Sequence, residues 1–385
     1  MIHFANSITS KLPNVGTTIF SVMSQLAHKH KAINLSQGFP DFQCAPELIE
    51  LVHQQMKKGH NQYAPMQGVQ ELREALCNKI NKLYGASYSP ETEINITAGA
   101  TQAIFTAISA LIKEGDEVIV LEPAYDCYVP AIQLSGGVPI YVELDPNDYH
   151  IPWEIVQKRI TQRTKMIIIN TPHNPTGSTL SEGDMHTLEK ILAGTDIIVL
   201  SDEVYEHIIF DGIQHQSIAR FPKLAERSIV TYSFGKTFHA TGWKLGFCLA
   251  PENIMNEFRK AHQFVVYTCN TPIQYALAEY LSDENNYQNL GNFYQEKRDY
   301  FCKLVKESRF KILPCTGSYF QLLDYSDITE EIDTEYAIRL TKEAGIASIP
   351  VSVFYHKPVH NNMLRFCFAK EKDTLEKAAE RLCKI

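Results

Sequence analysis

Four short apolar runs in the middle of the chain constrain its fold more than any other feature. They are EVIVL (117–121), MIIIN (166–170), IIVLS (197–201) and IVTYS (229–233). Continuous runs of β-branched residues are typical of strands buried on both faces, as in a parallel sheet covered by helices. Helical patterns lie between them, at 101–113 and 181–192. This alternation predicts an α/β core.

The two ends of the chain have a different pattern. The first 45 residues are rich in turn signals, and from about residue 285 a long polar helix (292–308) precedes short strands at 317–323 and 363–368. With 385 residues the chain is long enough for two domains. We expect an N-terminal arm and part of a small domain at 1–45, a large domain at 46–285 and a small α+β domain at 286–385.

Composition excludes several classes of protein. The formal net charge is -8 and the basic residues are scattered, which argues against a nucleic-acid partner. No run reaches the roughly 18 uncharged apolar residues that span a membrane, and the N-terminus lacks the pattern of a secretory signal. The nine cysteines form no C-x-x-C pair, so we expect reduced thiols in a cytoplasmic protein.

A lysine follows the last of the four runs. Lys236 lies in SFGKT (233–237), and strand ends of open α/β sheets face the ligand crevice. A solvent-exposed loop lysine is the alternative. A phosphate-binding loop is excluded because Val230 occupies the position of its first glycine, and no G-x-G-x-x-G follows any strand.

Three other strand ends carry polar or small residues. Asp202 ends a buried run, where helix capping is the alternative; His207 has no second histidine to make a metal site, and we predict none. The segment 170–177 has turn chemistry, with His173 as a spectator. The segment 95–102 turns into a helix whose first N–H groups suit an anion. Together with Lys236, these groups would hold a phosphorylated pyridine aldehyde.

Longer motifs extend over essentially the whole chain. They are NLSQGFPDF (34–42), NQYAPMQG (61–68), GDEVIVLEPAYDCY (115–128), NTPHNPTG (170–177), SDEVYEH (201–207), SFGKTFHATGWKLG (233–246) and IPVSVFY (349–355). The sequence therefore resembles the class I aminotransferases of fold type I. Within them it is most similar to bacterial methionine aminotransferases and the kynurenine aminotransferase/glutamine transaminase K subgroup. The resemblance implies pyridoxal 5′-phosphate (PLP) as cofactor. It also implies a mostly parallel sheet sandwiched by helices, with a smaller α+β domain.

The resemblance assigns catalytic roles to Lys236, Asp202 and Tyr205, and contacts with the cofactor ring to Asn174 and Tyr125. Lys236 resembles the lysine that holds PLP as a Schiff base and later moves a proton between the substrate Cα and C4′ of the cofactor. Asp202 resembles the partner of the pyridine nitrogen. Tyr205 and Asn174 resemble the donors to the ring's 3-oxygen, and Tyr125 resembles the residue stacked on the ring.

The remaining implied contacts hold the phosphate and the substrate. The phosphate cradle would consist of Gly99, Ala100, Thr101, Ser233 and Lys244, completed by Tyr63 from the second subunit of a homodimer. Many relatives have arginine where this chain has Lys244, which keeps the charge but not the bidentate geometry. Arg365 resembles the fork for the substrate carboxylate, with Gly38, Asn174 and Phe20 as further substrate contacts. The resemblance also suggests a cis bond between Asn174 and Pro175.

The predicted substrate follows from the side-chain pocket. No second arginine is present for a distal carboxylate, and Phe20, Phe39, Tyr125 and Phe354 would form an apolar wall, with ordinary core positions as the alternative. We expect transfer from methionine first, then from aromatic residues, glutamine and kynurenine, to a 2-oxo acid by a ping-pong mechanism. A PLP-dependent carbon–sulfur β-lyase of the cysteine-conjugate or cystathionine type is the main alternative. A non-catalytic PLP-binding regulator lacks a spare DNA-binding segment, and a dehydrogenase lacks its fingerprint.

Overall fold

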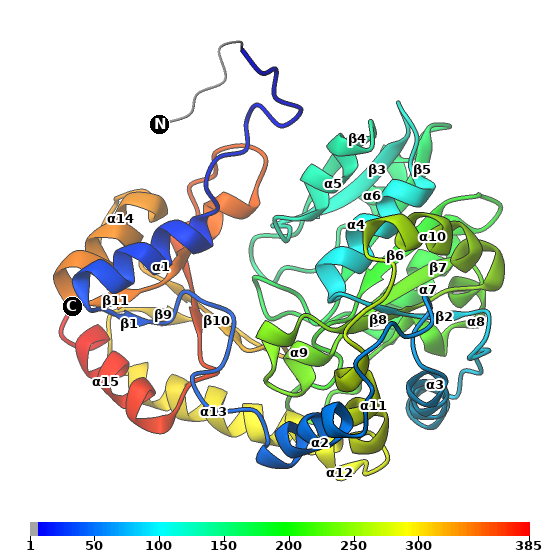
Figure 1. Cartoon of the computed structure of the whole chain (residues 1–385). Helices are drawn as coiled ribbons and strands as arrows, with labels where there is room; N and C mark the ends of the chain where they lie inside the picture. Colours follow the sequence, from blue (N-terminus) through cyan, green and yellow to red (C-terminus); the bar gives the residue numbers. More distant parts are fainter. Residues whose placement is uncertain (1–6) are drawn as a thin grey trace.

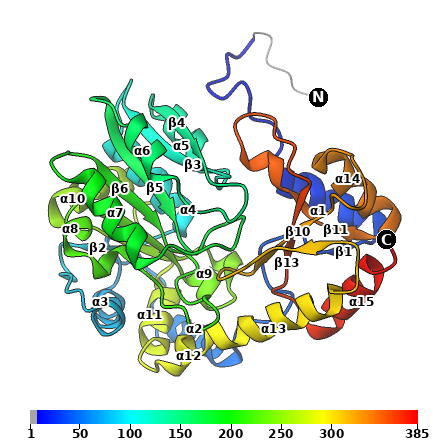
Figure 2. The same ribbon diagram turned by 180° about the vertical axis from the view of Figure 1, so that it is seen from behind.

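The computed structural model describes residues 7–385, so the first six residues of the expected N-terminal arm lie outside the described residues. Figures 1 and 2 show two groups of elements, one around a large sheet and one around a small sheet. The blue helix α1 (Ile19–His30) lies in the second group, beside α14 (Asp333–Arg339) and near α15 (Lys372–Leu382). Helix α1 therefore joins a group that is formed mainly by the C-terminal part of the chain.

The large sheet has seven strands. In spatial order they are β2 (Ile94–Thr97), β8 (Gly246–Leu249), β7 (Ser228–Ser233), β6 (Ile198–Asp202), β5 (Thr164–Asn170), β3 (Glu117–Glu122) and β4 (Val138–Glu143). Every neighbouring pair is parallel except the two pairs that β8 makes. The four apolar runs form β3, β5, β6 and β7, which confirms the predicted, mostly parallel sheet.

Helices cover both faces of this sheet because its strands are apolar on both sides. Val118, Ile168 and Leu200 face α4 (Ala100–Leu111), α5 (Tyr128–Leu134) and α10 (Glu252–Val265). The opposite face packs against α7 (Glu182–Leu192), which lies in the predicted helical stretch 181–192 and begins with a reciprocal Ser181–Asp184 capping box. The α/β fold is thus confirmed. The other helices of this part are α2 (Pro46–Lys57), α3 (Gln70–Tyr84), α6 (Trp153–Arg159), α8 (Pro222–Ala225), α9 (Phe234–Thr237), α11 (Thr271–Tyr280) and α12 (Asn285–Gln288).

The second group of elements is α+β, as its sequence pattern predicts. Its antiparallel sheet has the order β12 (Ile349–Pro350), β13 (Met363–Cys367), β10 (Phe320–Asp324) and β9 (Lys311–Ile312). The predicted polar helix is α13 (Leu290–Val305), which runs from α12 toward α15 in Figure 1. The arm adds β1 (Ile33–Asn34), which pairs with β11 (Ile346–Ala347). The domain boundaries at 45/46 and 285/286 stay predictions.

The fold positions polar residues at one edge of the large sheet. Asn170 and Asp202 end β5 and β6 as register partners, and Ser233 ends β7 next to α9. In Figure 1 α9 lies between the two groups of elements. The Asn174–Pro175 peptide bond beside this edge is cis. No helix within residues 7–385 is long and apolar enough to cross a membrane.

Candidate active site

A cavity of about 320 Å³ lies between the strand ends of the large sheet and the small sheet. Thirteen of the fourteen predicted site residues line it: Phe20, Gly38, Gly99, Ala100, Thr101, Tyr125, Asn174, Asp202, Tyr205, Ser233, Lys236, Lys244 and Arg365. The exception is Tyr63, which is 82% exposed and packs edge-to-face on Tyr267. The structure therefore brings the predicted residues together, while their individual roles stay predictions.

Lys236 reaches the cavity from the short helix α9. Its Nζ donates to the carbonyl oxygen of Gly38 at 2.9 Å and to the hydroxyl of Tyr319 at 2.8 Å. Burial, together with the charges of Arg365 and Lys244, lowers the pKa of Lys236 to about 8. A lysine with such a pKa has an appreciable neutral fraction near neutral pH, as a nucleophile or base requires.

Asp202 is almost fully buried at the end of β6. One carboxylate oxygen accepts from the Tyr128 hydroxyl at 2.7 Å, and the other from the Val204 N–H at 3.4 Å. Burial raises the pKa of Asp202 to about 6 in spite of these hydrogen bonds. A buried carboxylate of this kind is stabilised by a cation in the cavity. A protonated pyridine nitrogen is such a cation.

Arg365 approaches from β13 of the small sheet and is 1% exposed. It donates through Nη1 to Asn174 Oδ1 at 2.6 Å and through Nη2 to the Ser36 carbonyl at 3.1 Å. Its Nε has no hydrogen-bond partner among the described residues. The guanidinium carbon lies 3.8 Å from the centre of the Phe320 ring, and burial lowers the pKa of Arg365 to about 10. An unpaired buried guanidinium N–H fits the carboxylate of a substrate.

The first turn of α4 forms an anion-binding corner. Gly99 precedes the helix with a φ of +82°, a conformation that favours glycine. A Cβ built there would lie 3.6 Å from Lys244 Nζ, so this ammonium group lies beside the helix N-terminus. The N–H groups of Ala100 and Thr101 belong to the same first turn, where a phosphate is favoured. With the environments of Lys236 and Asp202, this corner completes the groups that PLP requires, and the site fits the cofactor.

Aromatic residues of the cavity differ in part from the prediction. Phe39 does not line it; its ring is 43% exposed and lies against Lys370 Nζ in a separate surface hollow. Phe354 lies behind Phe20, with the two ring centroids 6.0 Å apart. Phe320 lines the cavity although it is absent from the predicted site residues. Of the four predicted aromatic residues, Phe20 and Tyr125 line the cavity, whereas Phe39 and Phe354 do not.

Tyr128 and Tyr319 are also absent from the sequence prediction. Tyr128 donates to Asp202, which is 74 residues further along the chain, and Tyr319 contacts Lys236 across 83 residues. The motif PAYDCY contains Tyr128, and the segment GSYF contains Tyr319. Tyr319 lies within the predicted strand 317–323, and Tyr128 lies several residues beyond the predicted strand 117–121, so neither residue occupies a strand end. His173 is buried against Thr176, as expected for a spectator.

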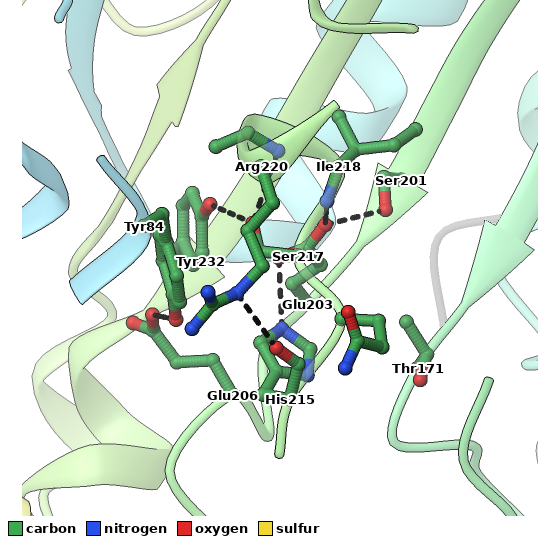
Figure 3. A network of polar contacts seen from close by, with 12 residues as sticks. Tyr84, Thr171, Ser201, Glu203, Glu206, His215, Ser217, Ile218, Arg220 and Tyr232 are labelled. Atoms are coloured by element: carbon green, nitrogen blue, oxygen red, sulfur yellow. Dashed lines mark hydrogen bonds and ion pairs between the residues drawn. The ribbon is translucent and has the colours of Figure 1, made fainter. Parts of the chain in front are cut away.

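Figure 3 shows a second polar cluster, which contains Glu203 and Glu206 from the same segment as Asp202 and Tyr205. Glu203 accepts from the Ser201 hydroxyl and the Ile218 N–H, each at 2.9 Å, and lies 2.9 Å from His215 Nε2. Glu206 accepts from the ammonium group of Lys79 and the hydroxyl of Tyr84. These contacts hold residues 202–206 through side chains that do not line the cavity.

Comparison with known proteins agrees with the geometry. The family model described as aminotransferase class I and II matches residues 30–382. Methionine aminotransferase of Escherichia coli is 48% identical over 374 residues, or 97% of each chain. Kynurenine–oxoglutarate transaminase 1 of Mus musculus is 36% identical, over 94% of this chain and 93% of its own. An Escherichia coli crystal structure with a methionine aminotransferase function has a TM-score of 0.97 at 47% identity, over 99% of this chain and 100% of that chain.

Proposed function

Because the chain belongs to the class I and II aminotransferases, we propose that it transfers the amino group of methionine to a 2-oxo acid by a ping-pong mechanism. Aromatic amino acids, glutamine and kynurenine are the further donors of this proposal. The single observation that carries it is the 48% identity to a methionine aminotransferase over 97% of both chains. The apolar rings of Phe20 and Phe320 in the cavity suit an uncharged side chain.

The class of reaction is that of the family. The protein is a PLP-dependent enzyme that transfers amino groups between an amino acid and a 2-oxo acid, and it is not a carbon–sulfur lyase. Bound PLP supplies an electron sink for the electron pair left on the substrate Cα. The residues of the chain bind, orient and move protons around that sink.

We assign the proton-transfer steps to Lys236 and Asp202. Lys236 Nζ takes the proton from the substrate Cα and later gives it up, which its lowered pKa favours. The Asp202 carboxylate keeps the ring nitrogen protonated, and the Tyr128 hydroxyl holds that carboxylate in place. Tyr205 and Asn174 serve as donors to the ring's 3-oxygen in this proposal.

The substrate is held by its carboxylate. Arg365 keeps one N–H without a partner inside the described structure, while Asn174 and Ser36 fix the other side of its guanidinium group. Phe320 packs against the guanidinium plane and excludes water from it. The phosphate end of the cofactor is assigned to the corner formed by Gly99 and Lys244.

We further propose a homodimer in which Tyr63 reaches the partner's site. Tyr63 and Phe264 are 82% and 86% exposed, and Val265 and Tyr267 add to the same apolar surface. Exposed apolar patches of this kind are typical of subunit interfaces. Sedimentation of the wild-type protein tests the proposal, and a fully active monomer would refute it. The nine free thiols support a cytoplasmic location, which cell fractionation tests.

The donor proposal is tested by a screen of the twenty amino acids against several 2-oxo acids. We expect methionine to have the highest kcat/KM or to be close to it, with aromatic residues and glutamine following. Apolar pockets discriminate by only about 1–3 kcal/mol per methylene group, so several donors should react. Aspartate far ahead of methionine would overturn the proposal. As the control, Lys236→Ala should lose both turnover and the visible absorption of the bound cofactor.

A further inference from the structure

The amine of Lys236 is held by the Gly38 carbonyl and the Tyr319 hydroxyl, which lie far from Lys236 in the sequence and outside its motif. Its Nζ donates to the Gly38 carbonyl oxygen at 2.9 Å and to the Tyr319 hydroxyl at 2.8 Å. The Tyr319 hydroxyl in turn donates its own proton to the same Gly38 carbonyl. The three groups therefore form a closed set of hydrogen bonds.

This arrangement is built from three distant parts of the chain. Gly38 comes from the arm and Tyr319 from the segment before β10, and Tyr319 is completely buried. A Cβ on Gly38 would lie 2.8 Å from the Phe320 ring, so the arm packs closely against the Tyr319 segment. The Tyr319 ring also packs edge-to-face on Tyr205, with centroids 5.1 Å apart. The hydroxyl is thus fixed by packing on several sides.

We propose that Tyr319 and the Gly38 carbonyl hold the Lys236 amine whenever it is not bonded to the cofactor, and that they direct its lone pair at the substrate. The proposal rests on the proposed aminotransferase function. It makes Tyr319 a residue of the catalytic site, because its hydroxyl touches the nitrogen that carries the proton.

The count of hydrogens supports this role. A neutral amine has two N–H bonds and one lone pair, and the two N–H bonds are taken by Gly38 and Tyr319. The lone pair is the one position left to accept the proton when the substrate Cα–H bond breaks. The electron pair of that bond stays with the substrate and its electron sink. The ammonium group then has a third N–H, and delivery of this proton to C4′ of the cofactor would restore the neutral amine.

Tyr319 is suited to accept from Lys236 and not to exchange protons with it. Burial raises the pKa of Tyr319 well above its usual value, and the neighbouring Tyr205 raises it further. The phenol therefore keeps its proton and directs it to Gly38. Its oxygen remains available as an acceptor for the amine.

Several ionisable groups besides Tyr319 lie near Lys236 Nζ and affect its pKa. Asp202 at the end of β6 and Cys367 on β13 raise the pKa of Lys236, while Arg365 and Lys244 lower it. Burial has the largest effect and lowers the pKa, and all these effects together give a pKa of about 8. An acceptor stabilises the ammonium form, so removing the Tyr319 hydroxyl should lower this pKa further.

The test compares Tyr319→Phe with Tyr294→Phe as a matched control. Phe keeps the ring contacts in both variants. Tyr294 is equally buried and its ring lies 5.6 Å from that of Tyr319, but its hydroxyl has no hydrogen-bond partner among residues 7–385. The control therefore removes a buried hydroxyl from the same aromatic cluster without touching Lys236.

The first measurement follows Lys236 directly. The full-length protein is loaded with pyridoxamine 5′-phosphate, which leaves Lys236 free, and its acetylation by acetic anhydride is measured by mass spectrometry across pH. We expect the Lys236 midpoint to fall by about one pH unit in Tyr319→Phe. The midpoint in Tyr294→Phe should equal that of the wild-type protein.

The second measurement follows the proton. In single turnovers with α-deuterated methionine, Tyr319→Phe should slow proton transfer by about 10-fold or more and enlarge the isotope effect. The KM for methionine should change little. Equal midpoints and equal isotope effects in Tyr319→Phe and wild type would overturn the proposal. If the wild-type protein rejects methionine, the donor proposal fails, whereas the acetylation midpoint, which needs no donor, still judges Tyr319.

Discussion

The two sides of residues 202–206 have similar burial and opposite electrostatics. Asp202 and Tyr205 line the cavity, whereas Glu203 and Glu206 do not line it. Glu203 and Glu206 belong instead to the polar network of Figure 3. Asp202, Glu203 and Glu206 are 3%, 0% and 5% exposed, so burial does not distinguish them. On the cavity side, burial raises the pKa of Asp202. Burial also raises the pKa of Glu206, but Lys79 and His207 bring it below its usual value.

This difference in pKa distinguishes buried carboxylates that are paired within the chain from one that is suited to bind a ligand. Buried polar groups in native proteins have partners, because an unpaired one costs free energy. Glu203 and Glu206 meet this condition within the chain itself. Asp202 remains with a raised pKa despite two hydrogen bonds. A carboxylate in that state inside a cavity is suited to bind a cationic group.

Asp202→Asn should have the largest effect, and this effect is on catalysis. We expect kcat/KM for methionine to fall by about 10⁴-fold, because an amide cannot keep a ring nitrogen protonated. The cofactor-free variant should be at least as stable as the wild-type protein at pH 7, since the buried charge is removed. Steady-state kinetics and thermal unfolding check the two parts. A variant that unfolds well below wild type would show that both sides of the segment are structural.

Glu206→Gln should have the converse effect. The substitution leaves Lys79 buried without a counter-charge, and we expect the free energy of unfolding to fall by about 3 kcal/mol. Folded molecules should retain most of their transamination rate. Urea unfolding measures the loss, and the double variant Lys79→Met/Glu206→Gln serves as control because it removes both charges. Recovery of stability in the double variant is expected; an unchanged single variant would contradict the pairing.

Much of this site could be predicted because its signals are local in the sequence. Asp202, Ser233 and Lys236 end or follow apolar runs, and the carboxyl ends of parallel strands meet at one edge. Gly99 precedes a helix whose N-terminus can be predicted from its small residues. The α/β fold followed from the same runs, because β-branched strands without a polar face need helices on both sides.

The rest depends on contacts between distant segments. In SDEVYE the spacing does not show which carboxylate faces the cavity, since Asp202 and Glu203 are adjacent and both are buried. Tyr319 reaches Lys236 only because the small sheet packs against the large one. Phe39 illustrates the same limit: an aromatic residue beside a motif was predicted to line the pocket, yet its ring packs on Lys370 at the surface.

The smallest effect expected is on the pH dependence of stability, where the two sides should differ in sign. The folded pKa of Asp202, about 6, lies above its ordinary value of 3.8, so the unfolded chain releases this proton first and stability falls as pH rises from about 4 to 6. The folded pKa of Glu206 lies below its ordinary value of 4.5. Its contribution is therefore present above about pH 4.5 and is lost as pH falls toward the folded pKa.

Each group can change the slope of the unfolding free energy against pH by at most about 1.4 kcal/mol per pH unit. Variants must therefore separate the two parts of this curve, which are the falling limb between about pH 4 and 6 and the acid limb below about pH 4.5. Urea unfolding of the cofactor-free protein across this pH range measures both. Asp202→Asn should remove the falling limb between about pH 4 and 6 and leave the acid limb intact. Glu206→Gln should flatten the acid limb and leave the other. If both variants flattened the same limb, the two carboxylates would share one environment, and the contrast between cavity and interior would be lost.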